Sequence, residues 1–398
     1  MNKPKKKSAL GRGLSVLLNN SDSYSVDINP TEEKIKVGVV AGEYSGDRLG
    51  AKIISGLKKT HHVELYGVGG PKIIQEGLSS IFDFSKLHVM GLIEPLIKYR
   101  QLRQLQKKLI NLFIENDVDY FIGIDSPDFN ISIHKILKQK EISKNIQVVS
   151  PSVWGWREGR IKNIKRYIDL TMCLFNFEHD YYRNKNLPSI HIGHPFSKLF
   201  KQDSQLVYKK YHLDASKKYI SILPGSRVSE IENLLPTYIE FINIHANKNE
   251  DYVYLIPASD QKIFETIDNL VPKSLPVKIS IDSAKDFLSI SDCSVVTSGT
   301  ATLEAAILGA SPIICYRTNP INYFIISRML KIDDVGLPNL LLGSRKFPEL
   351  IQKKCTPQEI LKAIESNDFH HLNSLSEQLR TLLIGSEETE HTNAILKL

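Results

Sequence analysis

The chain has 398 residues, of which 42% are hydrophobic and 24% are charged. This length exceeds what one hydrophobic core usually serves, so we expect two domains, and the composition excludes a disordered or fibrous protein. The net charge of +7 favours anionic partners such as nucleotides or phospholipids, but it is no nucleic-acid signature, and we expect no nucleic-acid partner. The four cysteines lack metal-binding spacing and predict core thiols. No apolar stretch is long enough to span a bilayer, so we expect a cytoplasmic chain.

The chain order of the elements predicts two α/β domains in series. Residues 1–33 are basic and then polar, which predicts a disordered tail. From 34 to 200, short apolar runs alternate with helical patterns, beginning with the strand KVGVVAG. After a charged stretch the alternation restarts at 219 and continues to 364, and residues 365–398 are helical. Such alternation indicates parallel sheets covered by helices, as in Rossmann-like domains.

Four motifs follow directly after predicted strands. They are AGEYSGD and GIDSPDFN in the first domain, and LPGSR and SVVTSGTATLE in the second. Open α/β sheets bind ligands beyond the carboxyl ends of their strands. We therefore expect these four loops to form the ligand site.

The stretch SVVTSGTATLE has the features of a nucleotide-binding turn. Gly299 permits unusual backbone angles, and Ser298 or Thr300 can cap the next helix. The N-terminus of that helix attracts a diphosphate. Glu304 lies one turn further, where its carboxylate can accept hydrogen bonds from ribose hydroxyls. The alternative is a capped core helix with a surface glutamate.

The stretch LPGSR adds a cation to this prediction. Gly225 and Ser226 allow a close backbone approach after a strand, and Arg227 offers forked donors to phosphate. The alternative is a surface arginine at a helix start. We expect neither a metal nor a cofactor.

The stretch GIDSPDFN carries two aspartates at a strand end. Asp125 or Asp128 can take a proton from an attacking hydroxyl, and partial burial would make either a better base. Alternatively, one of them caps the helix that follows Pro127. We expect one aspartate in each role and favour Asp128 as the base.

Two further loops of the first domain are expected to line the ligand site. AGEYSGD lacks both the G-x-G-x-x-G spacing and the P-loop lysine, which argues against a dehydrogenase or an ATPase. SPSVWGWREGR is either a packed aromatic corner or a loop that lines the ligand. The candidate residues of these loops are Ser45, Gly46, Asp47, Trp154, Trp156 and Arg157.

The stretch HVMGLIEPLIKYRQLRQLQKK combines apolar and basic residues. It is either a helix that covers the sheet with a solvated basic face, or one that lies on an anionic membrane surface. The candidate membrane contacts are Met90, Leu92, Ile93, Leu96, Lys98, Arg100 and Arg103.

Together these stretches resemble the lipid A disaccharide synthases, a family of inverting glycosyltransferases. The matching segments, in family order, are AGEYSGDRLGA, GVGGPKIIQEGL, VMGLIEPL, FIGIDSPDFN, VSPSVWGWREGRIKNI, LPGSRVSEIE, SGTATLEAAILG and LPNLLLG. The resemblance covers nearly the whole chain apart from its tail. It implies a GT-B fold, with two Rossmann-like domains facing a cleft and a C-terminal helix that crosses back to the first domain.

The resemblance also implies an activity. The family joins UDP-2,3-diacylglucosamine to 2,3-diacylglucosamine 1-phosphate (lipid X), and its members are peripheral on the inner face of the inner membrane. By the same resemblance, one aspartate of GIDSPDF would act as the base. UDP would be held by Arg227 with its neighbour Ser226, Ser298, Gly299, Thr300, Glu304 and Asn339. The loop expected as SVWAWR has Gly155, and the first turn has Tyr44; both can alter acceptor preference.

Two other hypotheses stay open at this point. A different GT-B protein, such as a UDP-N-acetylglucosamine 2-epimerase or a glycosyltransferase with a different acceptor, would share the nucleotide motifs. The tail segment KKKSALGRGLSVLL resembles the start of ParB-type partitioning proteins, which predicts a partner ATPase if the tail is functional. The oligomeric state is not indicated.

Overall fold

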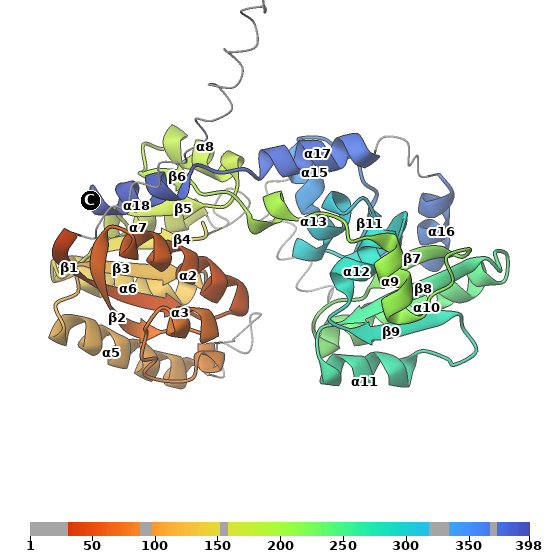
Figure 1. The fold of residues 1–398 in the computed structure, drawn as a ribbon, viewed down its shortest axis with the longest axis horizontal. Coiled ribbons are helices and arrows are strands. Elements are labelled where there is room, and N and C mark those ends of the chain that lie inside the picture. Colours follow the sequence, from red (N-terminus) through yellow and green to blue (C-terminus); the bar gives the residue numbers. More distant parts are fainter. Residues whose placement is uncertain (1–30, 88–97, 152–157, 318–333, 367–371) are drawn as a thin grey trace, which may run out of the picture.

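Two six-stranded parallel sheets form the framework of the molecule. Figure 1 shows them in two lobes. The computed structural model describes residues 31–87, 98–151, 158–317, 334–366 and 372–398. Each sheet is accompanied by helices that follow its strands in the chain. The expected α/β fold with two Rossmann-like units is therefore confirmed.

The first sheet has the strand order β2-β1-β3-β4-β5-β6. Its strands are β1 (Thr31–Ala41), β2 (His61–Val68), β3 (Tyr120–Ile124), β4 (Lys144–Val148), β5 (Leu170–Cys173) and β6 (Ser189–His191). Its helices are α2 (Tyr44–Lys58), α3 (Pro71–Gln75), α5 (Tyr99–Glu115), α6 (Pro127–Gln139), α7 (Ile161–Tyr167) and α8 (Asn176–Asn184).

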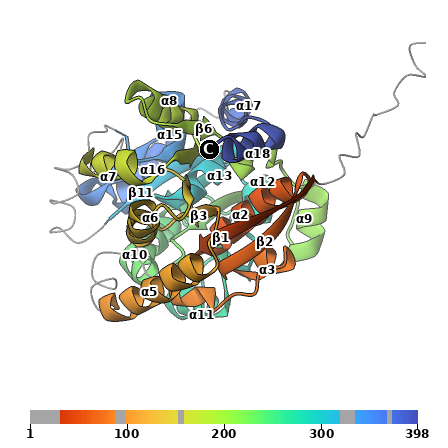
Figure 2. The ribbon, with the colours of Figure 1, turned by 90° about the vertical axis from the view of Figure 1, so that its left-hand side faces the viewer.

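Both faces of the first sheet are buried, which explains the nearly continuous apolar runs in its strands. Val37 and Val39 pack with α2 on one face, whereas Val40 and Phe121 pack with α5 and α6 on the other. Figure 2 shows α5 and α6 on one side of β1 and β3, and α2 and α18 on the other.

The second sheet has the order β12-β11-β10-β7-β8-β9. Its strands are β7 (Lys218–Leu223), β8 (Tyr252–Ala258), β9 (Val277–Ile281), β10 (Cys293–Thr297), β11 (Ser311–Tyr316) and β12 (Glu349–Ile351). Its helices are α9 (Ser204–Tyr211), α10 (Val228–Ala246), α11 (Gln261–Leu270), α12 (Ala284–Ile290), α13 (Thr300–Ile307), α15 (Leu337–Leu342) and α16 (Pro357–Glu365). Short 3-10 helices are η2 (Phe84–Leu87), η3 (Glu158–Arg160), η4 (Pro195–Lys198) and η5 (Gln352–Lys354).

The charged stretch between the two expected domains contains a helix. Val207 and Tyr211 of α9 are buried against Phe287 of α12, so this stretch packs with the second sheet. Lys209 and Lys210 are exposed in the last turn of this short amphipathic helix, and such charges made the stretch resemble a linker.

The C-terminal residues connect the two halves. The helix α17 (Leu372–Leu382) packs against α13 and α15 in the second half, and α18 (Glu388–Leu396) packs against α2 in the first. Figure 1 shows this blue segment running from the right-hand lobe to the left-hand lobe. The expected crossing helix is thus α18, whereas α17, also expected to pack on the first domain, lies on the second.

Several predictions fall on parts of the chain outside the described residues. These are the tail at 1–30, the aromatic loop with Trp154, Trp156 and Arg157, and the apolar membrane candidates Met90, Leu92, Ile93 and Leu96. The first strand begins at Thr31, inside the segment 1–33 that we expected to be a tail.

The strand orders place the four motifs at two special points. In the first sheet the chain order reverses between β1 and β3, and in the second between β7 and β10. Such a reversal leaves a crevice beyond the carboxyl ends of the two strands, because their connections diverge to opposite faces. AGEYSGD and GIDSPDFN flank the first reversal, and LPGSR and SVVTSGTATLE flank the second.

Candidate active site

The turn after β10 presents an uncapped helix N-terminus. Gly299 is the N-cap of α13, and no side chain caps the helix. The expected cap by Ser298 or Thr300 is therefore wrong: Ser298 Oγ lies 3.5 Å from Val335 O, and Thr300 is exposed at the first helical position. A Cβ atom on Gly299 would meet no atom within 4 Å, so there is open space beside this turn. Free N–H groups beside open space suit a phosphate.

The loop after β7 carries an ion pair. Arg227 Nη1 lies 2.6 Å from Glu230 Oε1, and the backbone N–H of Ser226 donates to Glu230 Oε2 at 3.1 Å. Gly225 has a φ of +124°, and a Cβ atom there would lie 2.6 Å from Glu230 Oε2. Glycine is therefore required for this turn. Ser226 and Arg227 are both exposed, in the position expected for diphosphate contacts.

Glu304 lies within α13, one turn after Thr300. Burial raises the pKa of its carboxyl, and the charge of Lys285 acts in the opposite direction. Within the described part of the chain no side chain donates a hydrogen bond to this half-buried carboxylate, which leaves it available to hydroxyl donors.

Asn339 has a different role from the one expected. Its side chain is fully buried, and Nδ2 donates to Phe347 O and to Glu349 Oε1, both at 2.9 Å. Its Oδ1 accepts from the backbone N–H groups of Lys346 and Phe347, at 3.0 and 2.9 Å. All four hydrogen-bonding positions of the carboxamide are therefore used inside the chain, which leaves none for UDP.

The network around Asn339 supports the nucleotide turn indirectly. Glu349 accepts from the backbone N–H groups of Val335 and Gly336, each at 3.0 Å. Val335 O in turn lies 3.5 Å from Ser298 Oγ. Asn339 and Glu349 thus hold the segment on which the turn at Ser298 rests.

The two aspartates after β3 lie in different surroundings. Asp125 is half-buried, and burial raises its pKa. Asp128, in the first turn of α6, is 71% exposed at its side chain and forms an ion pair with Arg160. Because a base in this position benefits from a raised pKa, the geometry favours Asp125 over Asp128, the reverse of our sequence-based preference.

Glu43 belongs to the same site, although the sequence did not single it out. Ala41 and Ile124 are register partners, so the turn at Glu43 lies beside the turn at Asp125. The pKa of Glu43 is raised by burial and by the charge of Asp125, and the charge of Arg227 opposes this. Arg227 belongs to the second sheet, so the two chain reversals lie close enough for their charges to interact. Only this three-dimensional proximity identifies Glu43.

The three candidate residues of AGEYSGD lie in different surroundings. Ser45 is exposed, whereas Gly46 is buried, where a Cβ atom would lie 3.2 Å from Ile124. Asp47 is 1% exposed, and its carboxylate accepts from the backbone N–H groups of Lys72 and Ile73. Asp47 therefore caps α3, and its burial keeps the carboxylate out of reach of a ligand, which corrects its expected role.

A cavity of about 480 Å³ lies beside the first turns of α5, where Arg103 lines it. Arg100 and Arg103 are exposed, Lys98 is half-buried, and Arg103 Nε donates to Tyr99 Oη at 3.1 Å. The residues that line the cavity include Leu87, Leu102, Arg103, Asp128 and Phe129. It therefore offers apolar surface, a cation and a candidate acidic residue together.

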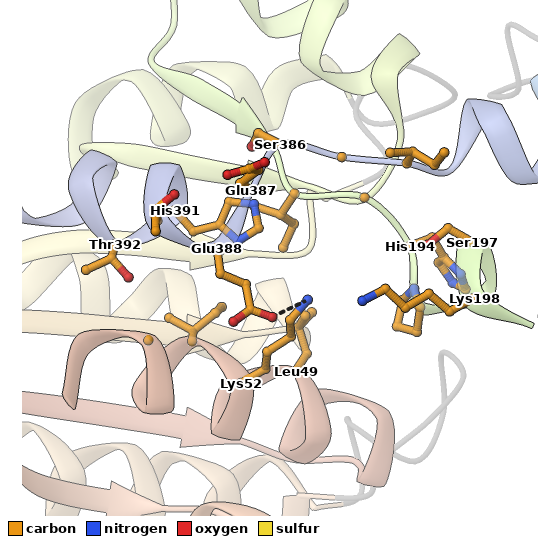
Figure 3. A pocket seen from close by; sticks show the side chains of 18 of the residues that line it. Leu49, Lys52, His194, Ser197, Lys198, Ser386, Glu387, Glu388, His391 and Thr392 are labelled. Carbon is orange, nitrogen blue, oxygen red and sulfur yellow. Dashed lines mark ion pairs between the residues drawn. The ribbon is translucent and has the colours of Figure 1, made fainter. Parts of the chain in front are cut away.

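A larger cavity, of about 860 Å³, lies where the chain crosses between the halves. Figure 3 shows it between α2, the segment at His194 and the segment at Ser386. Lys52 and Lys59 both pair there with Glu388, at 3.2 and 3.3 Å. Two of its lysines thus share one carboxylate, and none of the four motifs' candidate residues lines the cavity. Burial lowers the pKa of His194 to about 4, and its Nδ1 accepts from Phe196 N, so this histidine caps the short helix η4.

No group of three or more histidine, cysteine, aspartate or glutamate residues in the described part of the chain could hold a metal ion. None of the helices in that part is long and apolar enough to cross a membrane.

Comparison with known proteins agrees with the geometry. Residues 37–394 match the model of the family described as lipid-A-disaccharide synthetase. The chain is 38% identical to the lipid-A-disaccharide synthase of Acinetobacter baylyi, over 83% of this chain and 88% of that protein.

Two solved structures have a similar fold at low identity. They are the UDP-GlcNAc 2-epimerase of Neisseria meningitidis bound to UDP-GlcNAc (TM-score 0.53, 12% identity, 92% of this chain and 98% of that one) and the MurG of Acinetobacter baumannii (TM-score 0.52, 11% identity, 92% and 100%). These likenesses concern the fold alone. The family match, however, covers nearly the whole chain. The chain therefore belongs to the lipid-A-disaccharide synthetase family and is a glycosyltransferase of lipid A biosynthesis.

Proposed function

We propose that the chain condenses UDP-2,3-diacylglucosamine with 2,3-diacylglucosamine 1-phosphate, giving UDP and a β-1′,6-linked disaccharide 1-phosphate. The assignment of roles to specific residues rests on one observation: the two points at which the strand order reverses lie close together. Arg227 from the second sheet acts electrostatically on Glu43, which itself lies beside Asp125 of the first. A transferase needs this arrangement, because the donor and the acceptor must meet between their binding loops.

The second sheet would bind the donor. The uncapped N-terminus of α13 and the guanidinium of Arg227 would contact the diphosphate, and Glu304 would accept hydrogen bonds from ribose hydroxyls. As the bond to the sugar breaks, negative charge grows on the leaving diphosphate. Arg227 and the helix N-terminus would stabilise this charge.

The first sheet would bind the acceptor and remove its proton. The 6-hydroxyl oxygen of the acceptor attacks the anomeric carbon, the bond from that carbon to the diphosphate oxygen breaks, and UDP leaves with the electron pair. Asp125 takes the hydroxyl proton. This single displacement inverts the configuration at the anomeric carbon.

The cavity beside Asp128 has the mixed character that the acceptor requires. Leu87, Leu102 and Phe129 would contact an acyl chain, and Arg103 would contact the phosphate. Arg100 and Arg103 lie at the exposed start of α5, which supports a peripheral position on the inner face of the inner membrane.

The test is a direct assay by mass spectrometry. Purified protein is mixed with UDP-2,3-diacylglucosamine and lipid X in detergent, with a chelator present. We expect the tetraacyl disaccharide 1-phosphate and one equivalent of UDP. Folded protein that binds UDP but makes no disaccharide would contradict the proposed acceptor.

A further inference from the structure

Three backbone carbonyls behind the candidate site converge on one buried side chain. Gln147, on β4, is 1% exposed, and its Nε2 lies 3.1 Å from Asp125 O, 3.0 Å from Val148 O and 3.3 Å from Val149 O. Carbonyl oxygens only accept hydrogen bonds, so the amino end of the carboxamide must face them. Gln147 thus contacts both the loop that carries Asp125 and the chain that leaves β4.

Both of these segments contain residues in the left-handed backbone region. The φ angles are +52° at Asp125, +38° at Ser126 and +67° at Val149. Residues other than glycine rarely adopt such angles, and a β-branched valine does so least readily. The surrounding structure must therefore hold these residues, and the bonds from Gln147 to Asp125 O and Val149 O can do so.

Two side chains of α6 complete the arrangement. Asn130 is fully buried, and its Nδ2 donates to Asp125 O at 2.8 Å. His134, one turn further, is also fully buried, with Nε2 at 3.2 Å from Gln147 Oε1. Burial lowers the pKa of His134 to about 4, so the ring is neutral, and Nε2 must carry the proton that Oε1 accepts. This bond fixes which end of the Gln147 amide faces the carbonyls.

We propose that Gln147 is a positioning residue for the glycosyl transfer: it holds the backbone of Asp125 in the conformation that directs its carboxylate to the acceptor hydroxyl. His134 orients the Gln147 amide, and Asn130 supports the same carbonyl from the other side. Gln147 itself is buried away from the substrates, so it acts only through Asp125. This inference rests on the proposed function, which makes Asp125 the base.

The test compares two amides of the same strand. Asn145 lies two residues before Gln147 and is fully buried, but its Nδ2 donates to His134 O and Tyr167 O, both at 2.8 Å. In Gln147→Met we expect kcat to fall about 100-fold, because a displacement near 1 Å has that effect on a reacting group. The KM for the UDP-sugar and the affinity for UDP stay within about twofold, because the second sheet binds the nucleotide.

The Asn145→Leu control separates positioning from stability. Its melting temperature should fall as much as that of Gln147→Met, while its kcat stays within about threefold of wild type. If Gln147→Met does not fold, Gln147→Glu keeps the length of the side chain and replaces the donor with an acceptor. Equal losses of kcat in the Asn145 and Gln147 variants, or no loss in the latter, would overturn the proposal.

A double substitution tests whether Gln147 acts through Asp125. Added to Asp125→Asn, Gln147→Met should lower the residual kcat by less than about threefold, because the group that it positions is gone. A further full 100-fold loss would show an independent role and contradict the proposal. Wild-type protein that forms no disaccharide would instead contradict the proposed function, so the two failures are distinguishable.

Discussion

The loop after β3 places two carboxylates three residues apart in opposite environments. Asp125 is half-buried beside Glu43, whereas Asp128 is exposed and paired with Arg160. Burial disfavours the charged form of Asp125 and raises its pKa. A carboxylate whose charged form is disfavoured by burial is a stronger proton acceptor.

Asp125→Asn should therefore lower activity and increase stability together. We expect kcat to fall about 100-fold or more, as for the loss of a general base, and Asp128→Asn to have a smaller effect. Burial raises the pKa of Asp125, so the folded chain binds this proton more tightly than the unfolded chain. Between the ordinary pKa of about 3.9 and the raised value, this group's contribution to stability decreases as pH increases.

At neutral pH the Asp125→Asn variant therefore avoids the free-energy cost of burying a charged carboxylate. Urea unfolding at pH 7 should show a higher midpoint for Asp125→Asn, and the difference should vanish below the ordinary pKa. A lower midpoint at pH 7, or kcat unchanged from wild type, would exclude Asp125 as a buried base.

The carboxylate of Glu304 is the proposed contact for the ribose of UDP. Glu304→Ala should weaken UDP binding about tenfold, which corresponds to the loss of a hydrogen bond to a charged group. The measurement is calorimetric titration with UDP. Glu232→Ala is the control, because Glu232 is an exposed carboxylate on α10 near the same loops. Equal affinities of the two variants would contradict the ribose contact.

The elements that carry the site were largely predictable from the sequence. Runs such as KVGVVAG and CSVVT become β1 and β10, and the Gly- and Ser-rich stretches after them become the expected turns. That these turns lie at two reversals of strand order is not a local property, because it depends on which strands pair. The same holds for Glu43, whose neighbours Asp125 and Arg227 are far away in the chain.

Polar residues within a motif were the part that the sequence could not resolve. Asp47 and Asn339 both look available, yet Asp47 caps α3, and Asn339 satisfies four groups around Glu349. Residue type and spacing do not reveal whether a side chain points into the chain or away from it. Both side chains are buried, and this burial determines that they bond within the chain.

The buried side chain of Asn339, in α15, should contribute to stability and not to UDP binding. Asn339→Leu leaves Glu349 without one donor and the N–H groups of Lys346 and Phe347 without acceptors, so the free energy of unfolding should fall by about 3 kcal/mol. Urea unfolding measures it. If stability were unchanged while UDP binding disappeared, Asn339 would contact the nucleotide directly after all.

At the scale of the whole molecule, two crossings of the chain join the halves. His194 N donates to Leu383 O, and Ser386 N donates to His191 O, both at 2.9 Å, so the outgoing and returning segments run side by side. Gly193 and Gly385 meet where the segments touch. The relative position of the two sheets, and hence of Asp125 and Arg227, depends on this contact.

Gly385→Ala should disturb the site from a distance. A Cβ atom there would lie 2.1 Å from Gly193 N and from Ile192 C, and because both are backbone atoms, the segments must separate. We expect a lower melting temperature and a kcat/KM reduced about tenfold or more, since donor and acceptor loops lie on different sheets. Gly159→Ala is the control, because a Cβ atom at Gly159 would meet nothing within 4 Å. UDP affinity should stay unchanged in Gly385→Ala, because α13 and the Arg227 loop belong to one sheet. If UDP binding fell as much as kcat/KM, the damage would lie within the second half and not between the two.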